Sequence, residues 1–285
     1  MIHPLRIAHR GASGTGLAPE NTLAAFEKAI QLGVDAIEID VHATSDGEIV
    51  VIHDSTLDRT TDRSGSIDQF TRDEVRAADA GGWVNPRFRG ERVPTLVEVL
   101  DLARHRVVVV IEIKADSIAE RVLKTADDLV AQDQIVIQSF SAETVRRVNV
   151  LDSGTPTALL VGKLSTVPSR VHARRLVRQV LEVGANTLNV WQAALTPALL
   201  EELRKRGVSV WTWTVDDAVI LRDVVELGVQ GILTNYPDRL NAVLEELESE
   251  GAILMPPGRR QRIKPSRWGR RRRIRKQTRT RTHGS

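Results

Sequence analysis

The chain has 285 residues, of which 41% are hydrophobic and 27% charged, enough to bury a sizeable core in one large α/β domain or two small ones. Cysteine is absent, which excludes disulfides and thiolate metal sites and makes a cytoplasmic location the default expectation. The formal net charge of +3 is unevenly spread, because Arg259–Ser285 carry 13 Lys/Arg and no acid, whereas Met1–Gly258 carry a balance of −10.

Apolar, β-branched runs alternate with helical periodicity along most of the chain, a pattern typical of βα units and a parallel sheet. The predicted strands are Arg6–His9, Ala36–Asp40, Val107–Lys114, Gln134–Phe140, Thr157–Val161, Thr187–Val190, Val208–Thr214 and Gly231–Thr234. The predicted helices are Asn21–Leu32, Leu96–Arg104, Ile118–Ala131, Ala142–Asn149, Val171–Val183, Pro197–Arg206, Asp217–Leu227 and Pro237–Leu247. Eight strands and eight helices predict a TIM (β/α)₈ barrel.

The runner-up fold is an open doubly wound sheet, but no glycine-rich dinucleotide fingerprint follows the first strand. No run approaches the roughly 18 to 20 apolar residues of a membrane span, so no transmembrane segment is expected.

One segment interrupts the alternation, at about residues 42–92. Asp46-Gly47 lies between two β-like runs and predicts a hairpin. With a two-residue turn, Asp40 would lie directly opposite His53. The polar stretch Ser55–Arg92 is expected to form an insertion on the barrel's rim.

Apolar periodicity stops near the C-terminus. We therefore expect a barrel domain over residues 1–250 and a basic, disordered tail over 251–285. The cations of residues 259–285 suggest weak contact with a polyanion or an anionic membrane surface. A rival hypothesis makes that contact, to nucleic acid or membrane, the main function.

Ionisable side chains gather at the C-terminal ends of the predicted strands, where TIM barrels place their reacting groups. Glu38 and Asp40 are two residues apart and share a face of their strand, and Glu112 and Lys114 repeat that spacing on the next parallel strand. Three carboxylates at one barrel end would repel one another unless a cation lies among them. Oxygen ligands favour Mg²⁺ or Ca²⁺, with Mn²⁺ as a third candidate, over zinc.

Two histidines are expected beside this ion, His9 at the end of the first strand and His53 on the hairpin. With Arg10 and Lys114 at hand, the group could hold a phosphoester and move protons on either side of phosphorus. Phosphodiester cleavage is the reaction class that this combination indicates.

The motifs HRG (His9–Gly11), APENT (Ala18–Thr22), EIDVHATSDGEIVVIHD (Glu38–Asp54), IEIK (Ile111–Lys114), QSF (Gln138–Phe140), WTV (Trp213–Val215) and TNYPD (Thr234–Asp238) together resemble the glycerophosphodiester phosphodiesterases. The resemblance implies a TIM barrel with a small insertion after its second strand. It also implies hydrolysis of glycerophosphodiesters, such as glycerophosphocholine or glycerophosphoethanolamine, to sn-glycerol 3-phosphate and an alcohol.

Carried over residue by residue, the resemblance makes His9 and His53 the proton acceptor and donor, and Glu38, Asp40 and Glu112 the ligands of one divalent ion. Arg10 and Lys114 are similar to the family's phosphate-contacting cations, and Trp213 resembles an aromatic wall of the substrate pocket. Glu20 and Asn21 are expected to order the first loop and helix. A lysophospholipase D-type enzyme on the same barrel is the nearer alternative.

Overall fold

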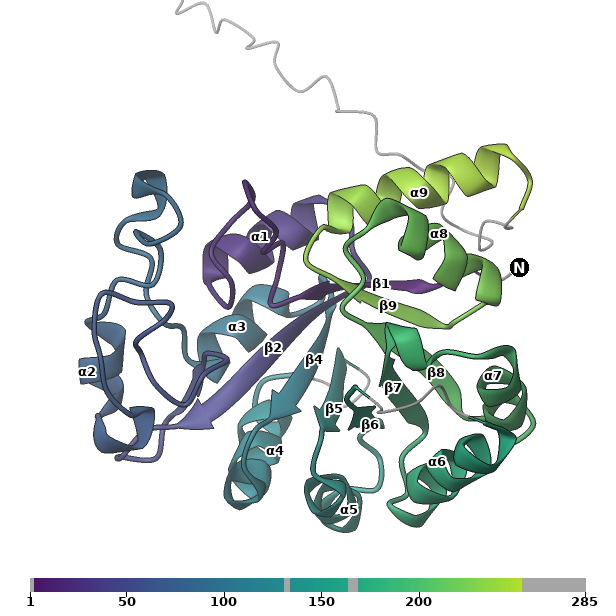
Figure 1. Ribbon diagram of the computed structural model, residues 1–285. Helices are drawn as coiled ribbons and strands as arrows, with labels where there is room; N and C mark the ends of the chain where they lie inside the picture. The colour runs from purple at the N-terminus through teal and green to yellow at the C-terminus, as the bar shows by residue number, and fades with distance from the viewer. Residues whose placement is uncertain (1–2, 131–133, 164–168, 253–285) are drawn as a thin grey trace, which may run out of the picture.

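Eight parallel strands form a closed barrel in the computed structural model, which describes residues 3–130, 134–163 and 169–252 (Figure 1). The strands are β1 (Leu5–His9), β2 (Ala36–Ala43), β4 (Val108–Ile113), β5 (Ile135–Ser139), β6 (Thr157–Val161), β7 (Thr187–Trp191), β8 (Ser209–Trp213) and β9 (Gly231–Thr234). Because β1 pairs with both β2 and β9, the sheet has no free edge among these strands. The predicted TIM barrel is confirmed.

Helices pack outside the strands, as Figure 1 shows. They are α1 (Leu23–Gln31), α3 (Leu96–Ala103), α4 (Ala119–Asp127), α5 (Ala142–Leu151), α6 (Arg170–Glu182), α7 (Pro197–Arg204), α8 (Ala218–Leu227) and α9 (Pro237–Ser249). Side-chain caps decide where several of them begin. Thr196, for example, accepts a hydrogen bond from the Leu199 amide, with Pro197 in the first turn.

Several predicted helix ends shift in the structure. The first helix begins at Leu23 rather than Asn21, because Thr22 is its cap and Asn21 has a left-handed φ of 55°. The helix predicted over Ile118–Ala131 runs from Ala119 to Asp127, and residue 131 lies outside the described residues.

Alternation along the strands separates two faces. Ile37 and Ile39 of β2 join the large cluster packed under the helices, whereas Ile7, Val110 and Trp211 fill the barrel interior. Above that interior layer the same inward-facing rows continue as polar residues. The interior is therefore apolar at its base and charged at its C-terminal rim.

The insertion after β2 contains β3 (Ile49–Val51), α2 (Arg72–Arg76) and two short 3₁₀ helices, η1 (Ile67–Gln69) and η2 (Pro86–Phe88). Two further 3₁₀ turns, η3 (Asp116–Ile118) and η5 (Gln192–Ala194), lie in loops of the barrel. The insertion has a small core of its own, made of Val50, Ile52, Leu57, Ile67, Val75, Ala80 and Val93. It protrudes beside α1 at the left of Figure 1.

The predicted hairpin register is wrong by one residue. Val41 pairs with Val51 and Ala43 with Ile49, so Asp40 lies opposite Ile52, whose amide donates to the Asp40 carbonyl at 2.9 Å. The turn has three residues rather than two, because Gly47 takes a left-handed φ of 85° and closes the longer loop.

The basic tail predicted over residues 251–285 falls almost wholly outside the described residues, which end at 252. Among the residues that are described, no helix is long and apolar enough to cross a membrane.

Candidate active site

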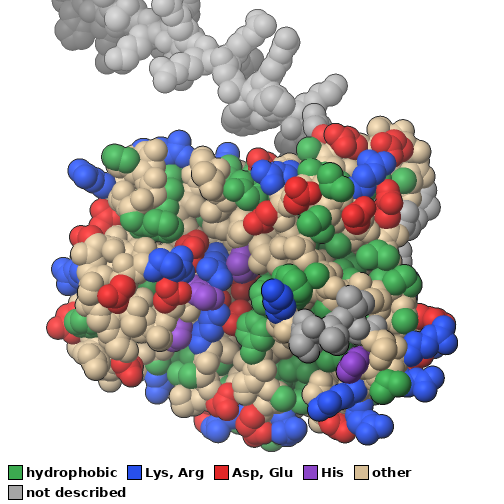
Figure 2. Space-filling view, in the orientation of Figure 1, with side chains coloured by type: hydrophobic (Ala, Val, Ile, Leu, Met, Phe, Trp, Pro, Cys, Tyr) green, Lys and Arg blue, Asp and Glu red, His purple; other side chains and the backbone are tan. Residues whose placement is uncertain are grey.

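The ends of the strands hold a cavity of about 140 Å³ that brings together most of the predicted site. Its lining consists of His9, Arg10, Glu38, His53, Glu112, Lys114, Gln138, Phe140, Leu160, Trp213 and Leu233. Asp40 is the one predicted site residue absent from this lining, and it lies fully buried behind the charged side. Figure 2 shows Lys/Arg, His and acidic side chains gathered in this hollow, with hydrophobic side chains along one border.

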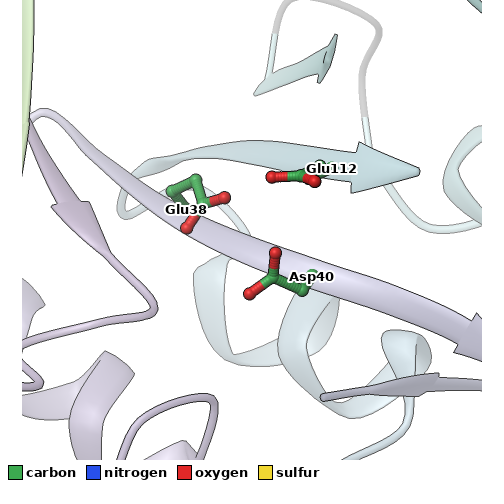
Figure 3. Close-up of side chains that lie close together, drawn as sticks. All are labelled: Glu38, Asp40 and Glu112. Atoms are coloured by element: carbon green, nitrogen blue, oxygen red, sulfur yellow. The ribbon is translucent and has the colours of Figure 1, made fainter. Parts of the chain in front are cut away.

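Glu38, Asp40 and Glu112 place carboxylate oxygens within 4.8 Å of one another, and all three side chains are buried. The parallel register of β2 and β4 pairs Asp40 with Glu112, which brings the two strands' acids together (Figure 3). Burial, and next the charge of Asp40, raise the pKa of Glu38 well above its ordinary range and that of Glu112 to about 7. The raised pKa values show that the three carboxylates repel one another and lack enough neighbouring positive charge.

Two cations already lie against this cluster. Lys114 Nζ is 2.5 Å from Glu112 Oε1 and 2.8 Å from Asp40 Oδ1, and Arg10 Nε is 3.3 Å from Asp40 Oδ2. Burial alone would raise the pKa of Asp40, but Lys114 and Arg10 outweigh it and hold that pKa below its usual range. Asp40 is therefore the acid of the three that stays ionised most readily.

The donor set fits a hard divalent cation. Each of the three acids offers a carboxylate oxygen, and Asp40 Oδ1 is buried and accepts no hydrogen bond from the described residues, meeting only Lys114 as an ion pair. Glu38 is held at both oxygens, by the Arg10 amide at 3.0 Å and by Gln138 Nε2 at 3.1 Å. Arg10 itself adopts a left-handed φ of 56° at this position.

The two predicted catalytic histidines both line the cavity, but their partners differ. His9 Nδ1 donates to the amide oxygen of Asn235 at 2.7 Å, and His53 Nδ1 donates to the Asp54 carboxylate at 2.6 Å. Burial, and then Arg10, lower the pKa of His9 to about 4, so this imidazole is neutral at physiological pH. His9 is thus set up to accept a proton at Nε2.

Asp54 is itself held by Arg59. Nε of Arg59 lies 2.7 Å from Asp54 Oδ2, and its Nη2 lies 2.8 Å from Glu20 Oε1, which also receives a hydrogen bond from Arg10. These contacts hold His53 at the cavity. The predicted hairpin register would instead have placed it directly opposite Asp40.

The other side of the cavity is apolar. Phe140 meets Trp213 edge to face, with ring centroids 5.4 Å apart and an interplanar angle of 79°. Leu160 and Leu233 complete this wall, and the Trp213 indole nitrogen is buried with no hydrogen-bond partner among the described residues. The cavity therefore pairs a charged half with an aromatic half.

Comparison with known proteins gives this cavity its context. Residues 9–239 match the Glycerophosphoryl diester phosphodiesterase family. The chain belongs to this family. Members of this phosphodiesterase family are hydrolases, and the matched span begins at the first cavity histidine and ends within α9.

Curated members of the family support the match. A glycerophosphodiester phosphodiesterase of Caldanaerobacter subterraneus is 36% identical over 242 residues, covering 83% of this chain and 96% of that protein. A glycerophosphodiester phosphodiesterase of Bacillus subtilis is 32% identical, covering 84% and 86%. The solved structure of an Oleispira antarctica phosphodiesterase in complex with the product sn-glycerol-3-phosphate has a TM-score of 0.76 at 26% identity, covering 85% and 97%.

The sequence did not predict that several further residues of this phosphodiesterase contact the site. Asn21, expected only to order the first loop, donates from Nδ2 to Asp40 Oδ2 at 2.9 Å. Asn235 supports His9, and Asp54 supports His53. The signal was present in the APENT and TNYPD motifs and in the end of the Glu38–Asp54 motif, but a motif does not say which side chain each of its polar residues would meet.

Proposed function

We propose that this protein hydrolyses glycerophosphodiesters in a metal-dependent reaction that yields sn-glycerol 3-phosphate and an alcohol. The observation that carries the proposal is the joint placement, around one small cavity, of three buried carboxylates, two cations and two differently partnered histidines. Membership of the phosphodiesterase family supports the reaction class. The product bound to the Oleispira relative supports the glycerol phosphate half of the substrate.

Glu38, Asp40 and Glu112 would hold one divalent cation, Mg²⁺ or Ca²⁺, with Mn²⁺ as a third candidate. When bound, such an ion supplies charge neutralisation for a phosphoryl oxygen. Arg10 and Lys114 line the same cavity and would contact the phosphate. Both cations pair with Asp40, so a phosphate could recruit them only by sharing them with that carboxylate.

His9 and His53 would act as proton acceptor and donor. His9 is neutral and presents an unprotonated Nε2, which suits a base that removes a proton from the attacking oxygen. His53 is oriented by the Asp54 carboxylate, which accepts the hydrogen bond from Nδ1, and it would act as the proton donor. The alcohol would then leave as a neutral hydroxyl compound after receiving the His53 proton.

Trp213 and Phe140 would form the wall against which the carbon skeleton of the substrate lies. We also propose that residues 1–250 are the catalytic domain, with the insertion at about residues 42–92 contributing His53. Residues 251–285 would then add nothing essential to hydrolysis.

The deciding experiment measures release of glycerol 3-phosphate from a panel of glycerophosphodiesters and lysophospholipids, with and without Mg²⁺ or Ca²⁺. We expect diester hydrolysis that chelation abolishes and that His9→Ala and His53→Ala each reduce by at least about 100-fold. His172→Ala, on the outer helix α6, is the matched control and should keep full activity.

Lack of release from every member of the panel, with metal supplied, would refute the proposal. Release from the lysophospholipids alone would assign the lysophospholipase D-type reaction instead.

A further inference from the structure

Behind His9 lies a polar chain that touches neither the cavity nor the carboxylate cluster. Asn235, which follows β9, receives the His9 hydrogen bond at its Oδ1, and its Nδ2 donates to Asp216 Oδ2 at 2.7 Å. Asp216, in the loop after β8, also accepts from the Asn235 backbone amide at 2.8 Å and from Thr234 Oγ1 at 3.1 Å. The loops after two neighbouring strands are thereby joined by one carboxylate.

The carboxylate decides which way the Asn235 amide faces. An ionised carboxylate only accepts hydrogen bonds, so the NH₂ end of Asn235 must point at Asp216 and the oxygen end must point at His9. The reversed amide would place its oxygen 2.7 Å from a carboxylate oxygen, without a proton between them. Ser13 Oγ lies 3.1 Å from the same Asn235 oxygen and 2.8 Å from the His9 carbonyl oxygen, and either oxygen can accept its single proton.

The orientation of Asn235 in turn decides the tautomer of His9. An amide oxygen can only accept, so His9 Nδ1 must carry the proton in the neutral ring, and Nε2 is left with its lone pair. We propose that Asp216 is a positioning residue that, through Asn235, fixes His9 as the Nδ1–H tautomer and so keeps Nε2 free to accept a proton. The consequence for catalysis rests on the proposed function; the tautomer itself does not.

Further contacts hold the loops that carry Asp216 and Asn235 in place. The Val215 amide donates to the Leu233 carbonyl at 2.9 Å, which ties the Asp216 loop to β9. Arg239 of α9 contacts the Asp216 carbonyl and lies over the Tyr236 ring, 4.2 Å from its centroid. The other histidine lacks an equivalent amide, because Asp54 meets His53 directly.

The test is the Asp216→Asn substitution in the full-length protein with Mg²⁺ present. The new amide side chain can donate as well as accept, so Asn235 is released to turn its NH₂ toward His9 and the Nε2–H tautomer becomes accessible. We expect kcat to fall about 10- to 100-fold, less than the roughly 100- to 10,000-fold contribution of a general base because the Nδ1–H tautomer stays partly populated, while KM changes less than about threefold. Two-dimensional ¹H–¹⁵N correlation spectra of ¹⁵N-histidine-labelled protein report the tautomer directly, with His9→Gln assigning the signal.

Asp217→Asn is the matched control. Asp217 is the neighbouring residue, its carboxylate caps α8 by accepting from the Val219 and Ile220 amides, and asparagine caps helices equally well. Its kcat should stay within about twofold of wild type. Asn235→Ala provides a second variant, and the double variant should lose no more activity than the worse single variant, because both act through one chain.

A wild-type His9 that carries its proton on Nε2, or an Asp216→Asn variant with unchanged tautomer and kcat, would overturn the inference. If wild-type His9 shows the Nδ1–H tautomer but no diester is hydrolysed, the proposed function fails and the tautomer assignment stands. The two failures are therefore distinguishable.

Discussion

Neutralising Glu112 should stabilise the metal-free protein at alkaline pH. Its carboxyl group is buried among the cluster, and burial and Asp40 raise its pKa from 4.5 to about 7. The folded state therefore binds a proton that the unfolded state has already released between pH 4.5 and 7. Because the folded state holds more protons in that window, the free energy of unfolding falls as pH rises through it and stays lowered above about pH 7.

The magnitude follows from the width of that window. The rise in the Glu112 pKa from 4.5 to about 7 lowers the free energy of unfolding by about 3 kcal/mol at pH 8, and this loss is absent below pH 4.5. Glu112→Gln replaces the carboxyl by a neutral group of the same shape, so it removes this penalty. It also relieves Glu38, whose raised pKa includes repulsion from Glu112. For a domain of this size we expect a gain of about 5–10 °C in Tm at pH 8, and little change at pH 4.5.

The assay is thermal or urea unfolding in the presence of a chelator at pH 4.5 and pH 8. Glu182→Gln, on the exposed face of α6, is the control for a simple loss of one surface charge. Adding Mg²⁺ or Ca²⁺ at pH 8 should reverse the order, because the ion stabilises wild type and loses one ligand in Glu112→Gln. A metal-free Glu112→Gln protein no more stable than wild type at pH 8 would refute the reasoning.

Three further outcomes are expected. Gly11→Ala should lower the free energy of unfolding in urea by about 2–4 kcal/mol, because φ is +82° and an added Cβ would lie 2.7 Å from the Ala25 backbone carbon. Gly33→Ala, where φ is +74° and the space around the added Cβ is open, should lower it by about 1 kcal/mol. Equal losses in the two variants would contradict the predicted clash. Asn21→Ala removes a hydrogen bond to Asp40 and should weaken metal binding about 10- to 100-fold by calorimetry, an unchanged affinity being the contrary result. Trp213→Phe keeps an aromatic ring, though a smaller one, and loses an indole N–H that is buried without a partner among the described residues, so KM should rise about 2- to 10-fold. An unaltered KM would show that this donor does not meet the substrate.

Strand positions were predictable because each is encoded locally. The bounds of β6 and β9 are the predicted ones, Thr157–Val161 and Gly231–Thr234. Alternation also placed Glu38 and Asp40 on one face, and the parallel barrel brought Glu112 to them. These conclusions needed only the period of a strand and the rule that strand ends meet at one rim.

Contacts that depend on single backbone angles were not predictable in the same way. The hairpin register moved by one residue because Gly47 closes a three-residue turn, and composition alone does not choose between the two turn lengths. Asn21 reaches Asp40 from a left-handed conformation, and the Arg10 amide reaches Glu38 from another. Both are non-glycine residues, in which a positive φ is uncommon, so residue type alone did not predict either contact.

The balance of charge around the cavity supports the proposed divalent cation. With all three carboxylates ionised, the cluster together with Arg10 and Lys114 would carry one net negative charge and would repel a phosphodiester monoanion. A divalent cation among the carboxylates would turn this into one positive charge, facing a substrate of charge −1. Neutral His9 adds nothing to that balance, because burial and then Arg10 keep its pKa low and its partner Asn235 is an uncharged amide. In the proposed mechanism, the amide partner would fix the proton position of the base and would leave the charge match between site and substrate undisturbed.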